Sequence, residues 1–384
     1  MSKTPKRLKV GLVVDDGLDK PDGVQQYVLA IGGWLKAQGH EVRYLAGQTT
    51  RQDIADVHSL SRNVRVRFNG NRLSIPLPTS RAKIRDFLER ERFDVLHVQT
   101  PHSPFMAQRV ILAADPRTAV IGTFHILPFS KLSAAGNRAL GVWLRPSLKR
   151  FDEIVSVSSA AAAFARTSFK IDTPVVPNAI DYQRFRDAQP FKEYDDNTLT
   201  ILFLGRLVPR KGCLLLIEAL ARLKTRDSLP KFRVLICGSG PLESKLRQLI
   251  AKHGLEDIVQ LTGFVSEADK PRYYASADLA VFPSQGGESF GIVLIEALAS
   301  GRAVVLAGDN PGYRSVMALQ PDLLFNTNNA DILTEKLEYY LTHAEKRQQM
   351  QKWGGEYTQR FDVSVVGAQL LDIYYRALRK RREA

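Results

Sequence analysis

Cysteine is nearly absent from this sequence, which holds only Cys213 and Cys237 among its 384 residues. Both lie inside apolar runs, where buried free thiols are expected rather than a disulfide. A chain without disulfides must be stabilised by its hydrophobic cores and fits a reducing compartment, so we expect a cytoplasmic protein.

Long hydrophobic runs are also missing. No stretch of about 18 uncharged apolar residues occurs, which excludes a membrane-spanning helix but leaves attachment to a membrane surface open. Asp15 and Asp16 interrupt the first apolar run within about five residues, so we expect no secretory signal peptide.

Metal-ligand patterns are lacking as well. The sequence has no array of cysteine and histidine with the spacing of a zinc site. Asp15 and Asp16 are adjacent, so their side chains point to opposite sides of a strand end, and no third ligand stands at a suitable spacing. We therefore expect neither a metal nor a cofactor.

Acidic residues are scarce in the first half of the chain. The net charge is +14, and residues 1–180 hold 26 basic and 15 acidic residues, against 28 and 25 in residues 181–384. Such an asymmetry indicates an anionic partner for the first half. Phospholipid headgroups, nucleic acid and phosphorylated small molecules all qualify.

What the sequence does contain is a regular alternation of short β-branched runs and helical patterns. Hydrophobic residues make up 44% and charged residues 24%, and the length suggests two domains of roughly 100–200 residues. The alternation predicts parallel, doubly wound α/β sheets. The polar stretch 181–197 reads as the interdomain connection. We expect strands at 8–14, 41–45, 94–99, 119–124, 153–158, 199–204, 233–237, 259–261, 279–282 and 303–306, and a last amphipathic helix over 364–379.

Two glutamates, Glu288 and Glu296, stand eight residues apart after a predicted strand. A helix that begins near Phe290 would present free backbone N–H groups to an anion such as a diphosphate. The carboxylates would lie on similar faces at depths that differ by about 12 Å. Alternatively, Glu288 only caps the helix and Glu296 is an exposed helix residue.

A basic loop follows the strand 199–204, with Arg206 and Lys211 bounded by glycines. Cations at the carboxyl end of a Rossmann-type strand can neutralise a departing diphosphate. A solvated basic loop is the alternative. Open parallel sheets bind ligands at this edge, so we expect the active site between the two domains.

Three histidines follow or end strands of the first half. His125 can hydrogen-bond a sugar hydroxyl or accept a proton, and His97 and His102 are the competing candidates. A single glycine, Gly23, opens the first helix and is explained equally well by a phosphate or by a structural turn. Gly238 and Gly240 lack the full dinucleotide fingerprint and fit a strand-to-helix turn.

These motifs, in this order along the chain, resemble the retaining GT-B glycosyltransferases of family four. The likeness covers nearly the whole sequence. Within the family, the segments Pro-Asp-Gly-Val-Gln, Phe-Asp-Val-Leu-His, Leu-Arg-Pro and Gly-Gly-Glu-Ser-Phe-Gly-Ile-Val-Leu are most similar to the bacterial phosphatidylinositol mannosyltransferases. The resemblance implies two Rossmann-like domains facing across a cleft: an acceptor domain over 1–180, a nucleotide-sugar domain over 181–363, and a helix over 364–384 that returns to the first.

The resemblance also implies roles for particular residues. His125, Arg206, Lys211 and Glu288 would carry the reaction, a front-face displacement in which the leaving phosphate helps to deprotonate the acceptor. The donor would be held by Gly23, Arg206, Lys211, Glu267, Glu288, Ser289, Phe290, Gly291, Ile292 and Glu296. In this scheme Glu296 contacts the ribose, and Glu267 lies beside the base and favours GDP-mannose.

The acceptor side is implied to bind a lipid at the inner face of the plasma membrane. Its residues would be Asp16, Gln25, Arg81, Lys83, Arg85 and Lys131. In the mannosyltransferases a basic amphipathic helix stands where Ile84, Phe87 and Leu88 here form an apolar stripe. A core-packed helix with a solvated face is the alternative.

Three departures from the family pattern concern the acceptor more than the donor: Asp22 replaces a glycine, Ile126 replaces a small polar residue, and an acid is missing between Arg206 and Lys211. A UDP-sugar transferase with another acceptor therefore stays open. A nucleic-acid-binding protein is disfavoured because no recognised binding motif accompanies the charge, and a dehydrogenase because neither Gly-rich turn has the required spacing.

Overall fold

The computed structural model describes residues 7–19, 22–68, 71–77, 79–127 and 140–383. The chain divides into two compact units: unit 1 comprises Met1–Ala179 and Val363–Ala384, and unit 2 comprises Ile180–Asp362. The expected boundaries at 180 and 363 fall within one residue of these.

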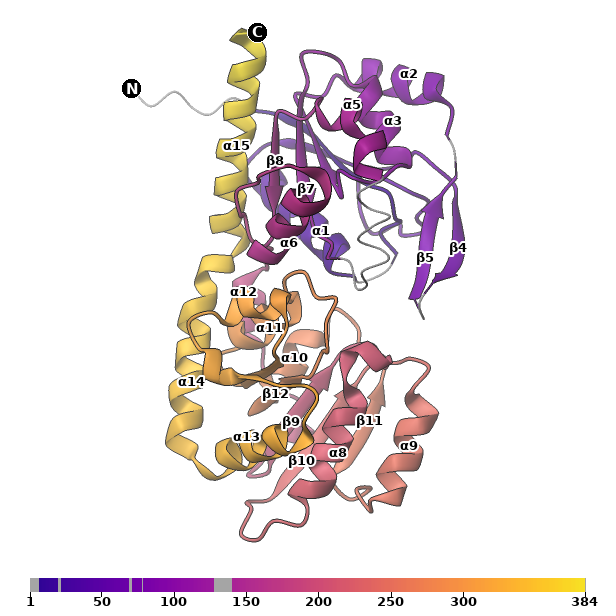
Figure 1. Ribbon diagram of the computed structural model, residues 1–384. Coiled ribbons are helices and arrows are strands. Elements are labelled where there is room, and N and C mark those ends of the chain that lie inside the picture. Colours follow the sequence, from indigo (N-terminus) through magenta and orange to yellow (C-terminus); the bar gives the residue numbers. More distant parts are fainter. Residues whose placement is uncertain (1–6, 20–21, 69–70, 78, 128–139, 384) are drawn as a thin grey trace, which may run out of the picture. The chain divides into compact units, whose positions relative to one another are not determined.

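Unit 1, whose first piece is coloured indigo to magenta in Figure 1, is built on a six-stranded sheet. The strand order is β3-β2-β1-β6-β7-β8. Every pairing in it is parallel, with Val10 of β1 opposite Val42 of β2 and Val95 of β6. The strands are β1 (Lys9–Val14), β2 (Glu41–Ala46), β3 (Val57–Ser59), β6 (Val95–Gln99), β7 (Ala119–Phe124) and β8 (Glu153–Ser156).

The helices of unit 1 bury their apolar faces against this sheet. The last helix, α15, contacts α1 and β7, and its Leu370 and Tyr374 are fully buried. The helices are α1 (Gly23–Ala37), α2 (Arg81–Glu91), α3 (Met106–Ala113), α5 (Arg145–Leu148), α6 (Ser159–Phe164), the π-helical turn η1 (Ala165–Phe169) and α15 (Val363–Glu383). An antiparallel hairpin, β4 (Asn63–Phe68) and β5 (Asn71–Pro76), forms a separate two-stranded sheet that the sequence reading missed.

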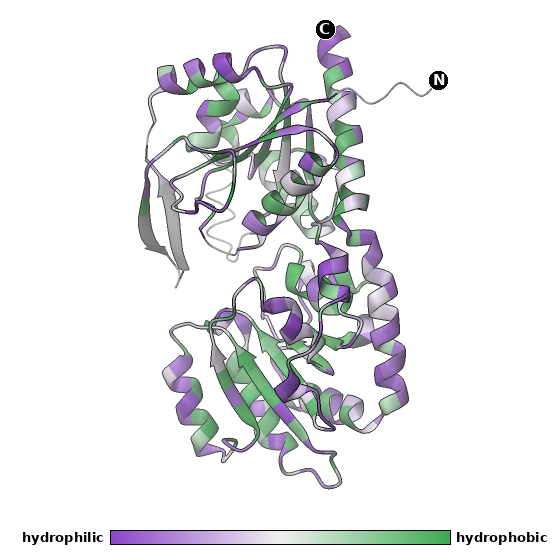
Figure 2. Ribbon diagram, turned by 180° about the vertical axis from the view of Figure 1, so that it is seen from behind, coloured by the Kyte–Doolittle hydropathy of each residue, from purple (hydrophilic) through white to green (hydrophobic). Residues whose placement is uncertain are grey.

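Unit 2 repeats the architecture with a sheet of order β11-β10-β9-β12-β13-β14. Its pairings are all parallel and its central strands are almost wholly buried, as expected for a sheet covered on both faces. Figure 2 shows these strands as mostly hydrophobic. They are β9 (Leu199–Leu204), β10 (Phe232–Cys237), β11 (Val259–Gly263), β12 (Leu279–Phe282), β13 (Val304–Gly308) and β14 (Leu324–Phe325).

The helices of unit 2 begin at α7 (Tyr182–Arg186), which lies inside the stretch expected to be a connection. That expectation was wrong. Asp181 caps α7 by accepting a hydrogen bond from the Arg184 amide, and α7, with its buried Phe185, contacts α10 (Lys270–Ala275) and α11 (Ile292–Ala299). The remaining helices are α8 (Cys213–Leu223), α9 (Glu243–Lys252), α10 (Lys270–Ala275), α11 (Ile292–Ala299), α12 (Pro311–Met317), α13 (Ala330–Thr342) and α14 (Ala344–Tyr357).

The two cysteines are free and fully buried, as the sequence predicted. Cys213 begins α8 and Cys237 ends β10. Burial raises the pKa of both thiols to about 12, so neither is a reactive thiolate near neutral pH.

Candidate functional site

A cluster of charged side chains in unit 2 lies where β9 and β12 end. These two strands are neighbours in the sheet, yet the chain leaves β9 toward β10 on one side and continues from β12 toward β13 on the other. Loops at such a switch point diverge and leave a crevice at the carboxyl ends of the strands. The basic loop after β9 and the Glu288 loop after β12 therefore meet at the edge where α/β sheets bind their ligands.

Glu288 is the centre of this cluster. Its Oε1 atom accepts hydrogen bonds from Lys211 Nζ at 2.9 Å and from Ser284 Oγ at 2.7 Å, and it is also bonded by Arg210 Nη1. Arg210 additionally donates to the Gly286 carbonyl at 3.1 Å. The two loops are thus joined by both charge and hydrogen bonds.

The ionisation of Glu288 follows from these contacts. Burial by itself would raise the pKa of this carboxyl, but the charges of Lys211 and Arg210 outweigh that effect and hold the pKa at about 2. Glu288 is therefore a carboxylate at any physiological pH. Its side chain retains 13% exposure and Lys211 retains 16%, so both remain accessible to a ligand.

Glycines let the loops of this cluster approach one another closely. Gly212 has φ +74°, and a Cβ there would lie 2.0 Å from the Pro283 carbonyl oxygen. A Cβ on Gly312, in the first turn of α12, would lie 2.1 Å from the carbonyl oxygen of Glu288. Gly238 and Gly240 pack as tightly against the backbone of Gly205 and Leu207. Gly238 and Gly240 therefore belong to a close strand-to-helix turn.

The segment that leads into α11 has an unusual backbone. Gly291 has φ +106°, and a Cβ at this position would lie 2.6 Å from the ring of Tyr313. The preceding Phe290 is buried and packs edge-on against Phe361 at 5.7 Å between ring centroids. Helix α11 begins at Ile292, two residues after the expected start, and so its first amides follow directly on Ser289, Phe290 and Gly291.

Glu296 lies on the inner face of α11 and is 3% exposed. Its Oε1 accepts a hydrogen bond from Lys270 Nζ at 3.0 Å, and its Oε2 accepts one from Tyr274 OH at 3.1 Å. Lys270 also pairs with Glu267 at 2.8 Å. Burial opposes the charge on Lys270, but Glu296 and Glu267 outweigh it and raise its pKa. The structure thus brings Glu267 and Glu296 together through a lysine that the sequence reading did not single out.

In unit 1 the corresponding switch point lies between β1 and β6. The Asp15 carboxylate joins the loops after these strands, because it accepts hydrogen bonds from Ser103 Oγ and from the Ala107 amide at 2.7 Å. Asp16 follows it on the same loop and bonds the Gly17 amide at 2.8 Å. Asp15 is therefore explained by structure rather than by metal binding.

Gly23 and Gln25 lie in the first turn of α1, after this loop. Gln25 is buried and donates from Nε2 to the Gly17 carbonyl at 3.3 Å. Its Oε1 atom is buried and has no hydrogen-bond partner among the residues that the structure describes. Asp22 is the N-cap residue of α1 but makes no side-chain cap bond.

The three candidate histidines of unit 1 are all buried. His125 Nε2 is 2.7 Å from Gln99 Oε1, and His97 lies between Tyr374 OH at 2.7 Å and Thr123 Oγ1 at 2.6 Å. Burial lowers the pKa of His97 and of His125 to about 3. His102 stacks on Phe124 with ring centroids 5.2 Å apart.

These positions separate the three roles. His97 uses both ring nitrogens within unit 1 and serves as a structural histidine, and His102 packs in an aromatic cluster. The Nδ1 atom of His102 also lacks a hydrogen-bond partner among the described residues, but its ring is packed against three phenylalanines. His125 remains the candidate for a ligand contact, with one ring nitrogen unused among the hydrogen bonds of the described part of the chain.

Helix α2 decides between the two readings of its apolar stripe. Ile84, Phe87 and Leu88 are buried in the core of unit 1, where α2 packs against α3. The stripe is therefore not available to lipid, and the core-packed alternative holds. The cations Arg81, Lys83 and Arg85 are exposed. Lys131, the other expected membrane residue, lies outside the described residues.

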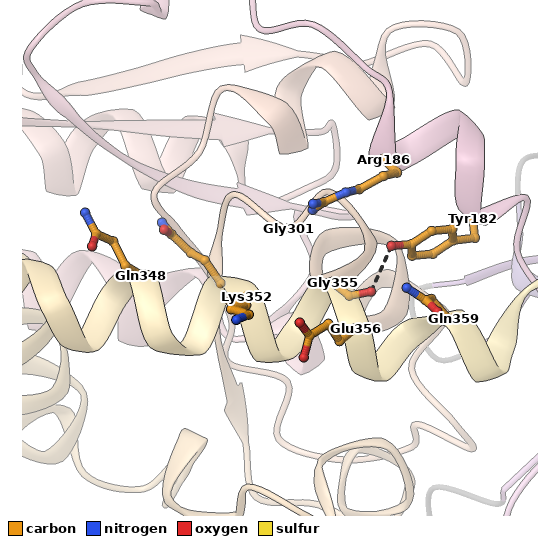
Figure 3. A pocket seen from close by; sticks show the side chains of 9 residues that line it. Tyr182, Arg186, Gly301, Gln348, Lys352, Gly355, Glu356 and Gln359 are labelled. Atoms are coloured by element: carbon orange, nitrogen blue, oxygen red, sulfur yellow. Dashed lines mark hydrogen bonds between the residues drawn. The ribbon is translucent and has the colours of Figure 1, made fainter.

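A groove of about 410 Å³ lies elsewhere in unit 2, between α14 and the segments around Arg186 and Gly301 (Figure 3). Gly301 and Gly355 leave room for the Arg186 guanidinium, which donates to the Ser300 carbonyl at 3.4 Å. Tyr182 OH donates to the Gly355 carbonyl at 2.9 Å. A cation beside the last carbonyls of α11 stabilises that helix end, so these contacts have a structural explanation.

In the part of the chain that the structure describes, no group of His, Cys, Asp and Glu side chains brings together the three ligands of a metal site. None of the helices in the same part is long and apolar enough to cross a membrane.

Comparison with solved structures defines the class of protein first. A glycosyltransferase from Rickettsia africae superposes with a TM-score of 0.75 at 22% identity, covering 97% of this chain and 99% of that one. A sucrose-phosphate synthase from Thermosynechococcus elongatus gives 0.72 at 20% identity, with 96% and 99% covered. The fold is that of the GT-B glycosyltransferases.

Sequence comparison then gives the family. Residues 21–184 match the model described as Glycosyltransferase Family 4, and residues 185–356 match Glycosyl transferases group 1. A phosphatidyl-myo-inositol mannosyltransferase of Mycolicibacterium smegmatis is 32% identical, with 96% of this chain and 93% of the relative covered. One from Propionibacterium freudenreichii is 30% identical, with 96% and 94% covered. This chain belongs to the glycosyltransferase family that includes these mannosyltransferases.

Proposed function

We propose that this glycosyltransferase transfers a hexose from a nucleoside-diphosphate sugar with retention of configuration and without a metal ion. The cluster at the ends of β9 and β12 is the observation that carries this proposal. Arg210 and Lys211 supply two cations there, Glu288 offsets one of them, and Arg206 stands on the same loop. The remaining positive charge of this cluster is suited to a diphosphate that gains charge as it leaves.

Glu288 has two functions in this scheme. Its carboxylate fixes the ends of Arg210 and Lys211, so that both cations are in place before the donor binds. It also offers a charged acceptor to the hydroxyls of the transferred sugar, next to the amides at the start of α11. The leaving phosphate takes the proton of the attacking hydroxyl, so the scheme needs no protein nucleophile.

We assign GDP-mannose as the donor and a phosphatidylinositol-type lipid as the acceptor. The names of the relatives support this choice, including a GDP-mannose-dependent mannosyltransferase from Mycobacterium tuberculosis that is 24% identical over 95% of this chain. The pair of Glu267 and Lys270 at the end of β11 offers an acceptor and a donor for a nucleobase or ribose. A UDP-sugar donor is the alternative, whereas binding of nucleic acid has no support from this family.

The acceptor places the enzyme on the inner face of the plasma membrane. Arg81, Lys83 and Arg85 supply the contact through charge alone, because the apolar residues of α2 are buried. Each cation near an anionic surface contributes about 1 kcal/mol, so the attachment is reversible.

The test is a panel of donors with vesicles of phosphatidylinositol in neutral lipid. GDP-mannose is expected to give a mannosylated lipid, identified by mass spectrometry, with the α-anomer of the donor kept in the product. EDTA should leave the rate unchanged. Turnover with UDP-sugars alone would remove the mannose assignment, and activity that EDTA abolishes and magnesium restores would refute the metal-free scheme.

A further inference from the structure

A buried amide contacts the imidazole of His125. Gln99, the last residue of β6, is fully buried, and its Oε1 lies 2.7 Å from His125 Nε2. His125 itself is 5% exposed and follows directly on β7, the neighbouring strand. Nothing in the proposed donor or acceptor chemistry uses this glutamine.

The second bond of the amide fixes which end of it faces the histidine. Gln99 Nε2 donates to the His97 carbonyl at 3.4 Å. If the amide were reversed, its oxygen would face that carbonyl oxygen, and two acceptors would repel each other. The Gln99 oxygen therefore faces His125, and because this oxygen can only accept, the hydrogen must reside on His125 Nε2.

We propose that Gln99 is a positioning residue that holds His125 as the tautomer with hydrogen on Nε2, which leaves Nδ1 as the ring's acceptor for a hydroxyl of the bound sugar. The part that concerns the sugar rests on the proposed function. The part that concerns the tautomer stands on the geometry alone. His125 then orients the sugar by accepting a hydrogen bond and has no proton to give to the leaving group.

The surroundings of His125 keep the ring neutral. Tyr27 of α1 packs against it edge-on with ring centroids 4.9 Å apart, and His97 of β6 is the other titratable group that acts on it. Neither is a carboxylate that could stabilise an imidazolium. Burial, with a smaller effect of His97, lowers the pKa of His125 to about 3.

The position of Gln99 is itself fixed by the sheet. Gln99 pairs with Thr123 in the β6–β7 register, and Thr123 Oγ1 bonds His97 Nε2 at 2.6 Å. Tyr374 of α15 holds the other nitrogen of His97 at 2.7 Å. Gln99, which accepts the hydrogen bond from His125, is thus held in place through β6, β7 and α15. A residue can fix the tautomer of a histidine only if its own position is fixed.

The tautomer can be measured directly by long-range ¹⁵N–¹H correlation of the histidine rings in the full chain. The sequence holds seven histidines, and a His125→Phe variant identifies the signals of this one. We expect a protonated Nε2 and an unprotonated Nδ1 between about pH 6 and 8, since the ring does not titrate there. A hydrogen on Nδ1, or a ring that titrates in this range, would overturn the proposal without any activity measurement.

Two substitutions separate positioning from packing. In Gln99→Met the buried Nε2–H loses its acceptor, so the hydrogen moves to Nδ1 and kcat is expected to fall about tenfold at every pH, with the donor KM changed less than about twofold. In Gln99→Glu the carboxylate accepts the same hydrogen but stabilises imidazolium. This variant should approach the wild-type rate near pH 8 and lose about tenfold relative to it near pH 5.5.

The matched control is Gln248→Met, on the exposed face of α9, which should change neither kcat nor its pH profile. A role in packing alone would make both Gln99 variants equally slow at all pH values, and that result would refute the positioning role. If wild-type protein transfers no sugar from any donor, the proposed function fails, while the ring spectrum still decides the tautomer.

Discussion

Lowering the pH from 7.5 to 5 is expected to destabilise unit 1 through three of its buried histidines, His97, His102 and His125. Burial lowers the pKa of His97 and His125 to about 3 and that of His102 to about 4. In the unfolded chain each histidine titrates near the ordinary value of 6.5. The unfolded state therefore takes up protons that the native state does not, so stability is fully present above pH 6.5 and is lost as the pH falls below it.

The size of the effect follows from the same values. At pH 5 each histidine of the unfolded chain is almost fully protonated, whereas the buried rings of the native protein stay neutral. This difference lowers the free energy of unfolding by about 2 kcal/mol per histidine. Three such groups give about 6 kcal/mol, which is comparable to the whole stability of many domains. Asp15 acts in the opposite direction, because burial raises its pKa.

Hydrogen exchange at β6 and β7 measures the effect, since amides in the centre of the sheet exchange by opening of the whole unit. His102→Leu should remove about one third of the pH dependence that these three histidines contribute, whereas replacing His253, an exposed residue of unit 2, by leucine should remove none of it. Equal protection of these strands at pH 7.5 and pH 5 would show that the three rings are not held neutral, and the reasoning would fail.

Three further outcomes are expected. Lys211→Ala should lower kcat about 100-fold or more, because a charge-assisted contact to the departing diphosphate is lost; steady-state assays with the preferred donor would show it, and unchanged turnover would contradict the role. Gly291→Ala should lower the stability of unit 2 by about 1–3 kcal/mol in thermal unfolding, since φ +106° and the Tyr313 ring both exclude a Cβ; an unaltered melt would be evidence against that strain. Replacing the three α2 cations Arg81, Lys83 and Arg85 by serine should weaken binding to anionic vesicles roughly 100-fold in co-sedimentation. The control replaces three cations of α9, Lys245, Arg247 and Lys252, by serine, and equal weakening by it would show that only the net charge matters.

The sheets were predictable because a parallel strand buried on both faces is a continuous apolar run. The strands 119–124, 199–204 and 279–282 have the expected bounds, and the others differ at one or both ends by a few residues. The hairpin of β4 and β5 was missed, since alternating valines and arginines give no continuous run. Residues 181–197 were misread as a linker because their polar composition conceals a short capped helix, α7.

Only those residues of the candidate site that belong to recognisable sequence motifs could be predicted. Charge type and strand position indicated Lys211 and Glu288, and the structure places them in contact. Arg210, Lys270 and Gln99 were not assigned roles, because their parts depend on which strands are neighbours in the sheet. The stripe on α2 shows the same limit: an amphipathic pattern does not tell whether the apolar face meets a membrane or a core.

Unit 1 is assembled from two separate pieces of the chain, with the whole of unit 2 inserted between them. During synthesis the surface of its first piece that packs against Val366 and Leu370 stays exposed until residues 363–383 have left the ribosome. A protein truncated before residue 363 would lose Tyr374 and with it the partner of His97. Unit 1 is therefore complete only once α15 has been made, and a chain that lacks this helix should aggregate rather than work slowly.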